Sequence, residues 1–154
     1  MSAERNAWVM TTYVHKVAGE GQLDLIDEIA NEDMVDLGVV AAGGPAGRDG
    51  LRLHARGAHV SMADRVTEIK RLVATDDEVM AWWTMTGTHS APWLGVETTG
   101  KRITATAFSF FRMRDGRIAE YEYWVDKLGL LLQLEGSTPP AMWTSHVINE
   151  VSID

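Results

Sequence analysis

Three long runs of aromatic and β-branched residues occupy the second half of the chain, at Val79–His89, Lys101–Met113 and Arg117–Val125. Runs of this composition are typical of pleated strands that bury one face. Asp115-Gly116 separates the second run from the third, and this dipeptide favours a tight hairpin because such a turn needs positive φ angles. The pattern therefore predicts an antiparallel meander of long strands.

The first half of the chain carries helical patterns and shorter strand patterns. Apolar residues recur at helical spacing across Ala3–Ala18, which predicts an amphipathic helix. After the meander, Asp126 is a typical N-cap and predicts a final helix over Lys127–Leu134. Between the first helix and the meander we expect a short helix over Gln22–Ala30, a turn at Asn31–Asp33, a short strand over Met34–Gly38, a loop over Val39–Gly44, a helix from Pro45 to about His59, and a strand over Val66–Ala74.

This order of elements predicts an α+β fold in which helices cover the concave face of a bent antiparallel sheet. A bent sheet that does not close leaves a hollow beneath the helices, which is a natural pocket for a small molecule. A chain of 154 residues fits one domain. We assign that domain to residues 1–136, and we expect residues 137–154 to form a tail that packs on the body or on a partner subunit.

Composition and charge exclude several classes of protein. The net charge of −8 argues against nucleic acid as a partner, because phosphates attract a basic face. The chain has no cysteine, which excludes disulfides, thiolate nucleophiles and zinc–sulfur sites. No apolar run approaches a membrane span and the first residues lack a secretory pattern, so we expect a cytoplasmic protein with no membrane partner. Six tryptophans and eight methionines predict a wide apolar cavity, a subunit interface, or both.

Strand alternation divides the aromatic residues between the two faces of the predicted sheet. Glu120 and Glu122 should point to water, which turns Tyr121 and Tyr123 inward. The residues that we expect to line the hollow are Trp83, Met85, Ser109, Phe111, Tyr121 and Tyr123.

The opposite face of the predicted sheet carries Phe108 and Phe110 and is unusually apolar for a solvated surface. A contiguous exposed aromatic patch is a liability on a monomer. We therefore expect a homodimer through this outer face. The alternative is that the C-terminal tail covers it.

Asp36 and Tyr13 are the candidate catalytic residues. Asp36 lies in a predicted strand, where aspartate is disfavoured, and by alternation it shares the inward face with Met34. A carboxylate facing an apolar cavity can serve as general acid or base; the alternative is a strand-end aspartate that binds a turn backbone. Tyr13 lies on the inner stripe of the first helix, where its phenol would orient a substrate oxygen, assist proton transfer, or simply belong to the core.

Three further polar residues are candidates for the pocket. His54 lies on the third helix and faces either the pocket or the surface. His89 follows Gly87-Thr88 at a strand end, where it lines the pocket mouth or braces the loop that carries Trp93. For Asp126 we favour the role of N-cap, and a catalytic role is the alternative. The chain has no metal-ligand spacing on one element, no phosphate loop and no nucleophile elbow, so an enzyme here would use cofactor-independent acid–base chemistry.

Several motifs resemble those of a known family. These are Gly87-Thr88-His89, the Arg114–Arg117 turn, and Trp124-x-Asp126 followed by Gln133-Leu134. From about Asn6 to Gln133 the chain resembles the SnoaL-like polyketide cyclases of the nuclear-transport-factor-two-like superfamily. The resemblance implies a cone-shaped α+β barrel with an internal hydrophobic pocket.

The resemblance also implies a departure from the family's aldol-type reaction. The positions that carry the catalytic His and Asp in the aldol-type cyclases fall on Ser109 and Tyr123. The acid–base pair of that reaction is therefore absent at those positions. The cyclases that act on polyether-type intermediates place an acid on the strand equivalent to that of Asp36.

The leading hypothesis is a cofactor-independent cyclase or isomerase acting on a hydrophobic polyketide-type intermediate in natural-product biosynthesis, including antibiotic biosynthesis. Acid–base chemistry and conformational control in an aromatic-lined pocket would drive it. Aldol closure, epoxide opening, conjugate addition, isomerisation and pericyclic closure stay open. One alternative is a non-catalytic ligand-binding or dimerisation module, and another is an enzyme like epoxide hydrolase or ketosteroid isomerase.

Overall fold

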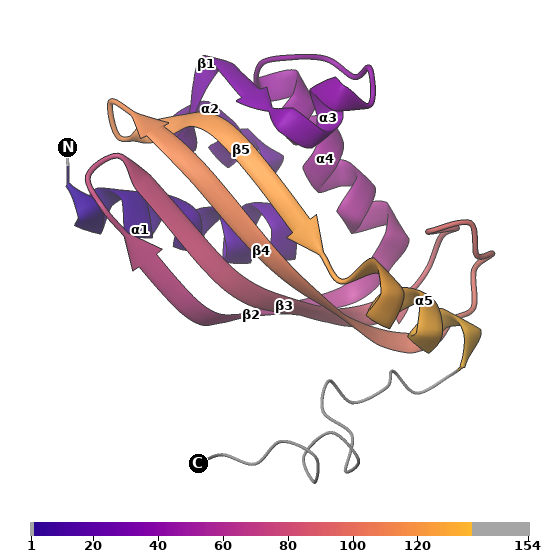
Figure 1. Ribbon diagram of the computed structural model, residues 1–154. Helices are drawn as coiled ribbons and strands as arrows, with labels where there is room; N and C mark the ends of the chain where they lie inside the picture. Colours follow the sequence, from indigo (N-terminus) through magenta and orange to yellow (C-terminus); the bar gives the residue numbers. More distant parts are fainter. Residues whose placement is uncertain (1, 137–154) are drawn as a thin grey trace, which may run out of the picture.

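A single five-stranded sheet forms the frame of the computed structural model, which describes residues 2–136 (Figure 1). The strands lie in the order β1-β5-β4-β3-β2, and every neighbouring pair is antiparallel except β1 with β5, which is parallel. The three predicted long strands are confirmed as β3, β4 and β5. The tail predicted for residues 137–154 lies outside the described residues. The strands are β1 (Ala30–Asp36), β2 (Met62–Ala74), β3 (Glu78–His89), β4 (Arg102–Arg114) and β5 (Arg117–Val125).

Asp115 and Gly116 make the tight connection between β4 and β5. Their φ angles are 53° and 66°. Glycine adopts this left-handed region without strain, and aspartate tolerates it better than most residues. Arg114 pairs with Arg117 across the turn, so the predicted hairpin is confirmed.

The helices complete a second layer against the sheet (Figure 1). α1 (Ala3–Thr12) continues directly into a π-helical segment, η1 (Tyr13–Gly19), so the first predicted helix is confirmed with a change of pitch in its second half. α1 contacts β2 and β3, whereas α4 contacts β1 and β2. Among residues 2–136, no helix is both long and apolar enough to cross a membrane. The other helices are η2 (Leu23–Leu25), α2 (Ile26–Ile29), α3 (Leu37–Ala41), α4 (Arg48–Ser61) and α5 (Lys127–Glu135).

Predictions on both sides of β1 were wrong. The segment 31–33, expected as a turn, belongs to β1, and Ala30 has left the second helix to start that strand. Pairing with β5 accounts for this, since Ala30 lies opposite Ile118 and the Asn31 side chain donates to the Ile118 carbonyl at 3.2 Å. The segment 37–41, expected as strand end and loop, is helix α3 instead, because the Asp36 side chain caps its first turn. β2 also starts earlier than predicted, at Met62.

α5 is fixed against β4 by side-chain hydrogen bonds to backbone groups. Gln133 accepts from the Thr104 N–H at 2.8 Å and donates to the Thr104 carbonyl at 3.0 Å. Lys101 donates to the Leu134 carbonyl at 2.8 Å near the end of the helix. The predicted N-cap is confirmed, because Asp126 Oδ1 accepts from the Gly129 N–H at 2.8 Å. These contacts fix the start of α5 beside the end of β5.

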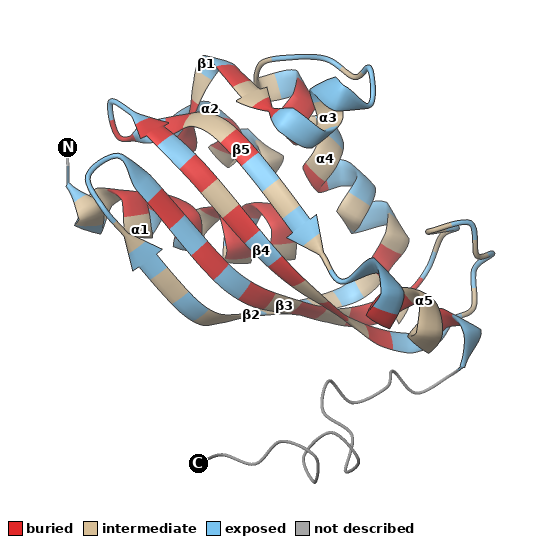
Figure 2. Cartoon of the chain, in the orientation of Figure 1, coloured by how far each residue is buried: buried red, intermediate tan, exposed pale blue. Residues whose placement is uncertain are grey.

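Buried and exposed residues alternate along β3 and β4, which separates an inner from an outer face (Figure 2). The predicted division of faces is confirmed. On the outer face, Trp82, Phe108 and Trp124 are 40%, 46% and 68% exposed. The inner face carries Trp83, Met85, Ser109, Phe111 and Tyr121, each almost completely buried.

Candidate active site

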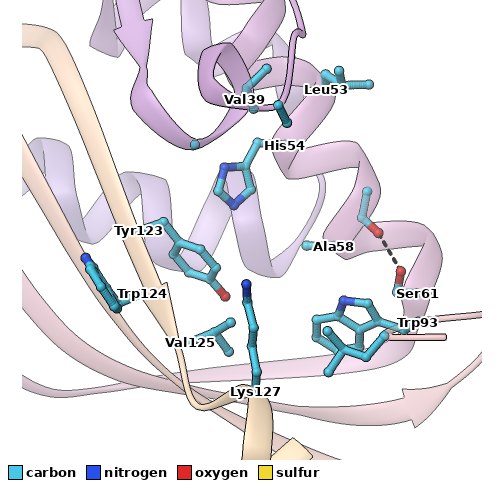
Figure 3. A pocket seen from close by; sticks show the side chains of 14 residues that line it. Val39, Leu53, His54, Ala58, Ser61, Trp93, Tyr123, Trp124, Val125 and Lys127 are labelled. Atoms are coloured by element: carbon cyan, nitrogen blue, oxygen red, sulfur yellow. Dashed lines mark hydrogen bonds between the residues drawn. The ribbon is translucent and has the colours of Figure 1, made fainter. Parts of the chain in front are cut away.

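The pocket lies where α3, α4, the loop after β3, the end of β5 and the start of α5 meet (Figure 3). Its volume is about 770 Å³, within the range of small-molecule sites. Four side chains give it polar character: His54, Ser61, Tyr123 and Lys127. Much of the remaining wall is apolar, formed by Val39, Ala42, Leu53, Ala58, Trp93, Leu94 and Val125.

Asp36 and His54 share a hydrogen bond at the wall of this pocket. The His54 Nδ1 lies 2.7 Å from Asp36 Oδ2. The other carboxylate oxygen, Oδ1, accepts from the Val39 N–H at 3.1 Å. Asp36 is 1% exposed and its carboxylate is fully engaged, whereas the His54 side chain is 20% exposed and lines the pocket. The pair therefore presents an imidazole to the pocket and keeps the carboxylate behind it.

Strand pairing and helix geometry bring these two residues together. Asp36 is the last residue of β1, where it lies opposite Tyr121 of β5. α4 crosses this end of the sheet and contacts β1, which brings His54 over the carboxylate. The imidazole stacks on the Tyr121 ring, with centroids 5.2 Å apart and an interplanar angle of 26°. It meets the edge of Tyr123 at 4.8 Å and 81°, so two aromatic contacts and one hydrogen bond set its orientation.

Asp36 takes the second of its two predicted alternatives, the strand-end aspartate that binds a turn backbone, although its side chain does turn inward. It is buried on the inner face with Met34, as predicted. It also binds a turn backbone at a strand end, as the N-cap of α3. It does not line the pocket, because His54 stands between the carboxylate and the cavity. The pocket therefore exposes the imidazole and not the carboxylate.

Tyr13 lies in the core behind the pocket wall. It is 1% exposed, and its ring meets the edges of Phe111 and Tyr121 at 5.3 and 5.2 Å. Burial raises its pKa well above the ordinary value, and the Asp36 carboxylate raises it further. The phenol therefore stays protonated, and it does not reach the pocket lining.

The other inner-face residues divide between core and pocket. Tyr123 lines the pocket as predicted. Trp83, Ser109 and Tyr121 form a buried chain in which the indole N–H donates to Ser109 Oγ at 3.0 Å and Ser109 shares a 3.1 Å hydrogen bond with the Tyr121 hydroxyl. Trp83, Met85, Ser109, Phe111 and Tyr121 all lie in the core and not in the pocket lining, because α1 and η1 fill the hollow over them.

His89 and Asp126 serve the segments that border the pocket. His89 is buried, its Nδ1 lying 3.0 Å from Thr99 Oγ1 and 3.2 Å from the Thr99 backbone nitrogen. These bonds brace the loop that carries Trp93, so His89 takes the bracing position of its two predicted alternatives. Asp126 caps α5 and does not line the pocket. Among residues 2–136, no cluster of three or more His, Cys, Asp or Glu side chains could hold a metal ion.

The sequence interpretation named His54 as a pocket candidate but missed Lys127 and the two other pocket residues on the same face of α4, Ala58 and Ser61. His54, Ala58 and Ser61 recur at spacings of one helical turn and all line the pocket. This period was visible in the sequence, although the packing of α4 was not. Lys127 had a weaker signal, a cation at the first position of a helix that follows a long strand.

Comparison with known proteins identifies the family. The family model for SnoaL-like polyketide cyclases matches residues 8–134. The chain belongs to the SnoaL-like polyketide cyclase family. No curated protein matches the sequence. Membership supports a cyclase- or isomerase-type role, and it confirms the predicted resemblance.

Solved structures share the fold of this family member. TsrD from Streptomyces laurentii aligns with a TM-score of 0.76 and 23% identity, over 87% of this chain and 97% of TsrD. IdmH from Streptomyces antibioticus, a candidate polyketide cyclase, aligns with a TM-score of 0.69 and 25% identity, over 84% of this chain and 98% of IdmH. AclR from Streptomyces galilaeus, a candidate hydroxylase, aligns with a TM-score of 0.72 and 23% identity, over 99% of this chain and 96% of AclR. These likenesses confirm the predicted α+β fold with its curved sheet wrapped round helices.

Proposed function

We propose that this SnoaL-like chain is a cofactor-independent cyclase or isomerase that acts on a hydrophobic polyketide-type intermediate of natural-product biosynthesis. The observation that carries the proposal is the contact between Asp36 and His54 at the wall of an apolar pocket. An imidazole held by a buried carboxylate is a recurrent arrangement for general acid–base catalysis. The pair occupies positions different from Ser109 and Tyr123, where the resemblance would have placed the aldol-type cyclase pair.

His54 is the proposed base. When Nδ1 donates to Asp36, the neutral imidazole keeps its lone pair on Nε2, away from the carboxylate. Nε2 takes a proton from a carbon next to a substrate carbonyl, and the electron pair of that C–H bond forms an enolate. The enolate carbon then attacks a second electrophilic carbon, or a proton returns at another position. The imidazolium gives the proton back in either case, and Asp36 stabilises it in the meantime.

Tyr123 and the apolar wall would orient the substrate. Burial raises the pKa of Tyr123 to about 12, so its phenol is neutral at physiological pH and can donate a hydrogen bond to a carbonyl oxygen. The ring lies 4.8 Å from the His54 ring centroid to centroid, which brings a donor and a base to the same part of the pocket. Trp93, Leu94 and Val125 supply apolar surface against which a flexible chain would fold into a reactive conformation.

A non-catalytic carrier is the alternative from another class. A carrier needs apolar walls but gains nothing from a pocket histidine held by a buried carboxylate. Burying that carboxylate costs free energy unless its hydrogen bonds compensate. The pairing of a pocket histidine with a buried carboxylate therefore favours an enzyme over a carrier.

Deuterium exchange tests the proposed proton transfer without knowledge of the natural substrate. Deoxybenzoin, a two-ring ketone with an exchangeable methylene group, is incubated with the protein in heavy water, and exchange is followed by NMR. We expect the protein to accelerate exchange, and His54→Gln to lower the acceleration by about 100-fold. His59→Gln is the matched control, because it removes a histidine of the same helix that lies outside the pocket lining. No acceleration by the wild type, or equal rates for wild type and His54→Gln, would contradict the proposal.

We also propose that a second copy of this chain covers the outer sheet face. The Trp82 and Phe108 rings stack there, with centroids 6.1 Å apart and an interplanar angle of 11°, and both remain substantially exposed. A second hollow lies on the same face, and its lining includes Met80, Phe108, Phe110 and Trp124. Sedimentation of the full chain should give a dimer, and Phe108→Glu should give a monomer with the same circular dichroism spectrum. A monomeric wild type would overturn the dimer.

A further inference from the structure

Lys127 is an exposed cation at the edge of the pocket that forms no ion pair with the residues the structure describes. It lines the cavity together with His54 and Tyr123. In Figure 3 its side chain rises from the start of α5 toward the space between those two rings. None of the ion pairs among residues 2–136 includes Lys127. Its ammonium group is therefore available to a bound molecule.

The position of Lys127 is unfavourable for the helix that carries it. Lys127 is the first residue of α5, and the first turn of a helix has a partial positive charge that repels a cation and attracts an anion. The helix is held by contacts elsewhere, since Asp126 caps it and Gln133 binds the backbone of Thr104. Helix stability thus gives no reason for a lysine here, whereas an anionic oxygen in the pocket would be attracted by its ammonium group.

The rest of the molecule makes a local cation necessary for binding an anion. The chain has a net charge of −8, so its overall field repels anionic ligands. The pocket is mostly apolar, and an anion placed there loses hydration unless a charged group compensates it. Among the residues that line the pocket, Lys127 is the one with a permanent positive charge at neutral pH.

We propose that Lys127 binds an anionic oxygen of the substrate, so that the pocket takes a hydrophobic molecule that carries a carboxylate or an enolisable β-dicarbonyl group. This inference rests on the proposed function, because it assigns the substrate class of the same site. With a β-dicarbonyl, His54 Nε2 accepts the proton from carbon and the electron pair of the C–H bond delocalises onto oxygen. That oxygen becomes negative and pairs with the Lys127 ammonium and the Tyr123 phenol. With a carboxylate, the same ammonium group anchors a charge that exists before the reaction.

Three probes separate these sources of negative charge. Naphthoate and naphthamide share a skeleton and differ in charge, and their binding is measured by calorimetry. Benzoylacetone is a β-diketone whose enolate absorbance reports its pKa when bound. If a carboxylate is recognised, the wild type should bind naphthoate about tenfold more tightly than naphthamide, and Lys127→Met should remove this preference. If an enolate is recognised, the protein should lower the pKa of bound benzoylacetone, and Lys127→Met should abolish that shift.

Control variants isolate the role of this one cation. Lys127→Arg keeps the charge and should keep most of the effect. Lys70→Met changes the net charge by the same amount on β2, where Lys70 pairs with Glu68 at 2.7 Å, and should leave all three probes unaffected. Identical behaviour of Lys127→Met and wild type towards all three probes would overturn the inference.

The same variants keep this inference distinguishable from the proposed function. His54→Gln should lose deuterium exchange and still prefer the anionic probe. A wild type that prefers the anion but exchanges no deuterium would defeat the proton-transfer proposal alone. A wild type that exchanges deuterium but ignores probe charge would defeat the anion proposal alone.

Discussion

Two neighbouring parts of the same concave sheet face have opposite properties, and two tyrosines of β5 mark the difference. Tyr121 is fully buried, in edge contact with Tyr13 and Phe111 at 5.2 and 5.0 Å. Tyr123, two residues further along the same face, lines a cavity of about 770 Å³. The sheet curves over both, but α1 and η1 fill the first part with side chains, whereas α4 and the Trp93 loop leave the second part hollow. Sheet curvature thus makes the hollow, and the covering helices decide which part becomes a site.

A matched pair of leucines on α4 gives the largest expected contrast between the filled and the hollow part. Leu51 is 0% exposed in the core, and Leu53 is 51% exposed at the pocket. Leu51→Ala should lower the free energy of unfolding by about 2–5 kcal/mol, because it leaves a cavity in packed surroundings. Leu53→Ala should change it by about 0.5 kcal/mol or less. Urea unfolding of both variants makes the comparison, and equal losses would show that the pocket wall is packed as tightly as the core.

The second-largest effect is expected at alkaline pH, where ionisation of the tyrosine phenols should lower the free energy of unfolding. Burial raises the pKa of Tyr123 from 10.0 to about 12, and it raises the pKa values of Tyr13 and Tyr121 as well. A phenol with a raised pKa in the folded state contributes stability that is fully present below pH 10 and is lost as the pH rises towards the folded value. For Tyr123 alone this amounts to about 3 kcal/mol.

Phenolate absorbance and unfolding free energy follow this titration together. The chain has three tyrosines, and at pH 10 the folded protein should show almost no phenolate. Unfolding in denaturant at the same pH should make the phenolate signal appear. A folded protein whose tyrosines are half ionised at pH 10 would contradict the raised pKa values of these three phenols.

Phenylalanine substitutions of Tyr121 and Tyr123 should give the smallest changes in stability. The first should affect mainly the free energy of unfolding, and the second mainly the exchange rate. Tyr121→Phe loses the hydrogen bond to Ser109 and should lower the free energy of unfolding by about 1 kcal/mol. Tyr123→Phe should change it by about 0.5 kcal/mol or less, but lower the deoxybenzoin exchange rate by about tenfold, because the substrate carbonyl loses a donor. Unchanged exchange in Tyr123→Phe would remove the phenol from the mechanism.

The strands were predictable because their signals are local. Alternation in the three long runs placed Tyr121 and Tyr123 on the inner face and Phe108 on the outer face, and Asp115-Gly116 marked the hairpin. Asp36 could be placed inward by the same period. The end of β1 was predicted wrongly, because the capping of α3 by Asp36 competes with strand propensity and the β1–β5 pairing is long-range.

The site was less predictable because it depends on how distant elements pack. Asp36 and His54 are eighteen positions apart, one on a strand and the other on a helix, and nothing in the local sequence of either residue indicates that they pair. Trp83 and Phe111 point inward as predicted, yet they lie in the core because α1 and η1 cover that part of the sheet. Lys127 lines the pocket at the start of α5, and this helix docks on β4 through Gln133.

The central claim is that Asp36 holds His54 so that Nε2 presents its lone pair to the pocket. The most direct test is the nitrogen NMR spectrum of the labelled protein above the titration range of the histidine. We predict that neutral His54 is protonated on Nδ1 in the wild type, and that Asp36→Asn shifts the ring towards the Nε2-protonated tautomer. A wild-type His54 that carries its proton on Nε2 would contradict the claim, because its lone pair would then lie on Nδ1, which faces the Asp36 carboxylate and not the pocket.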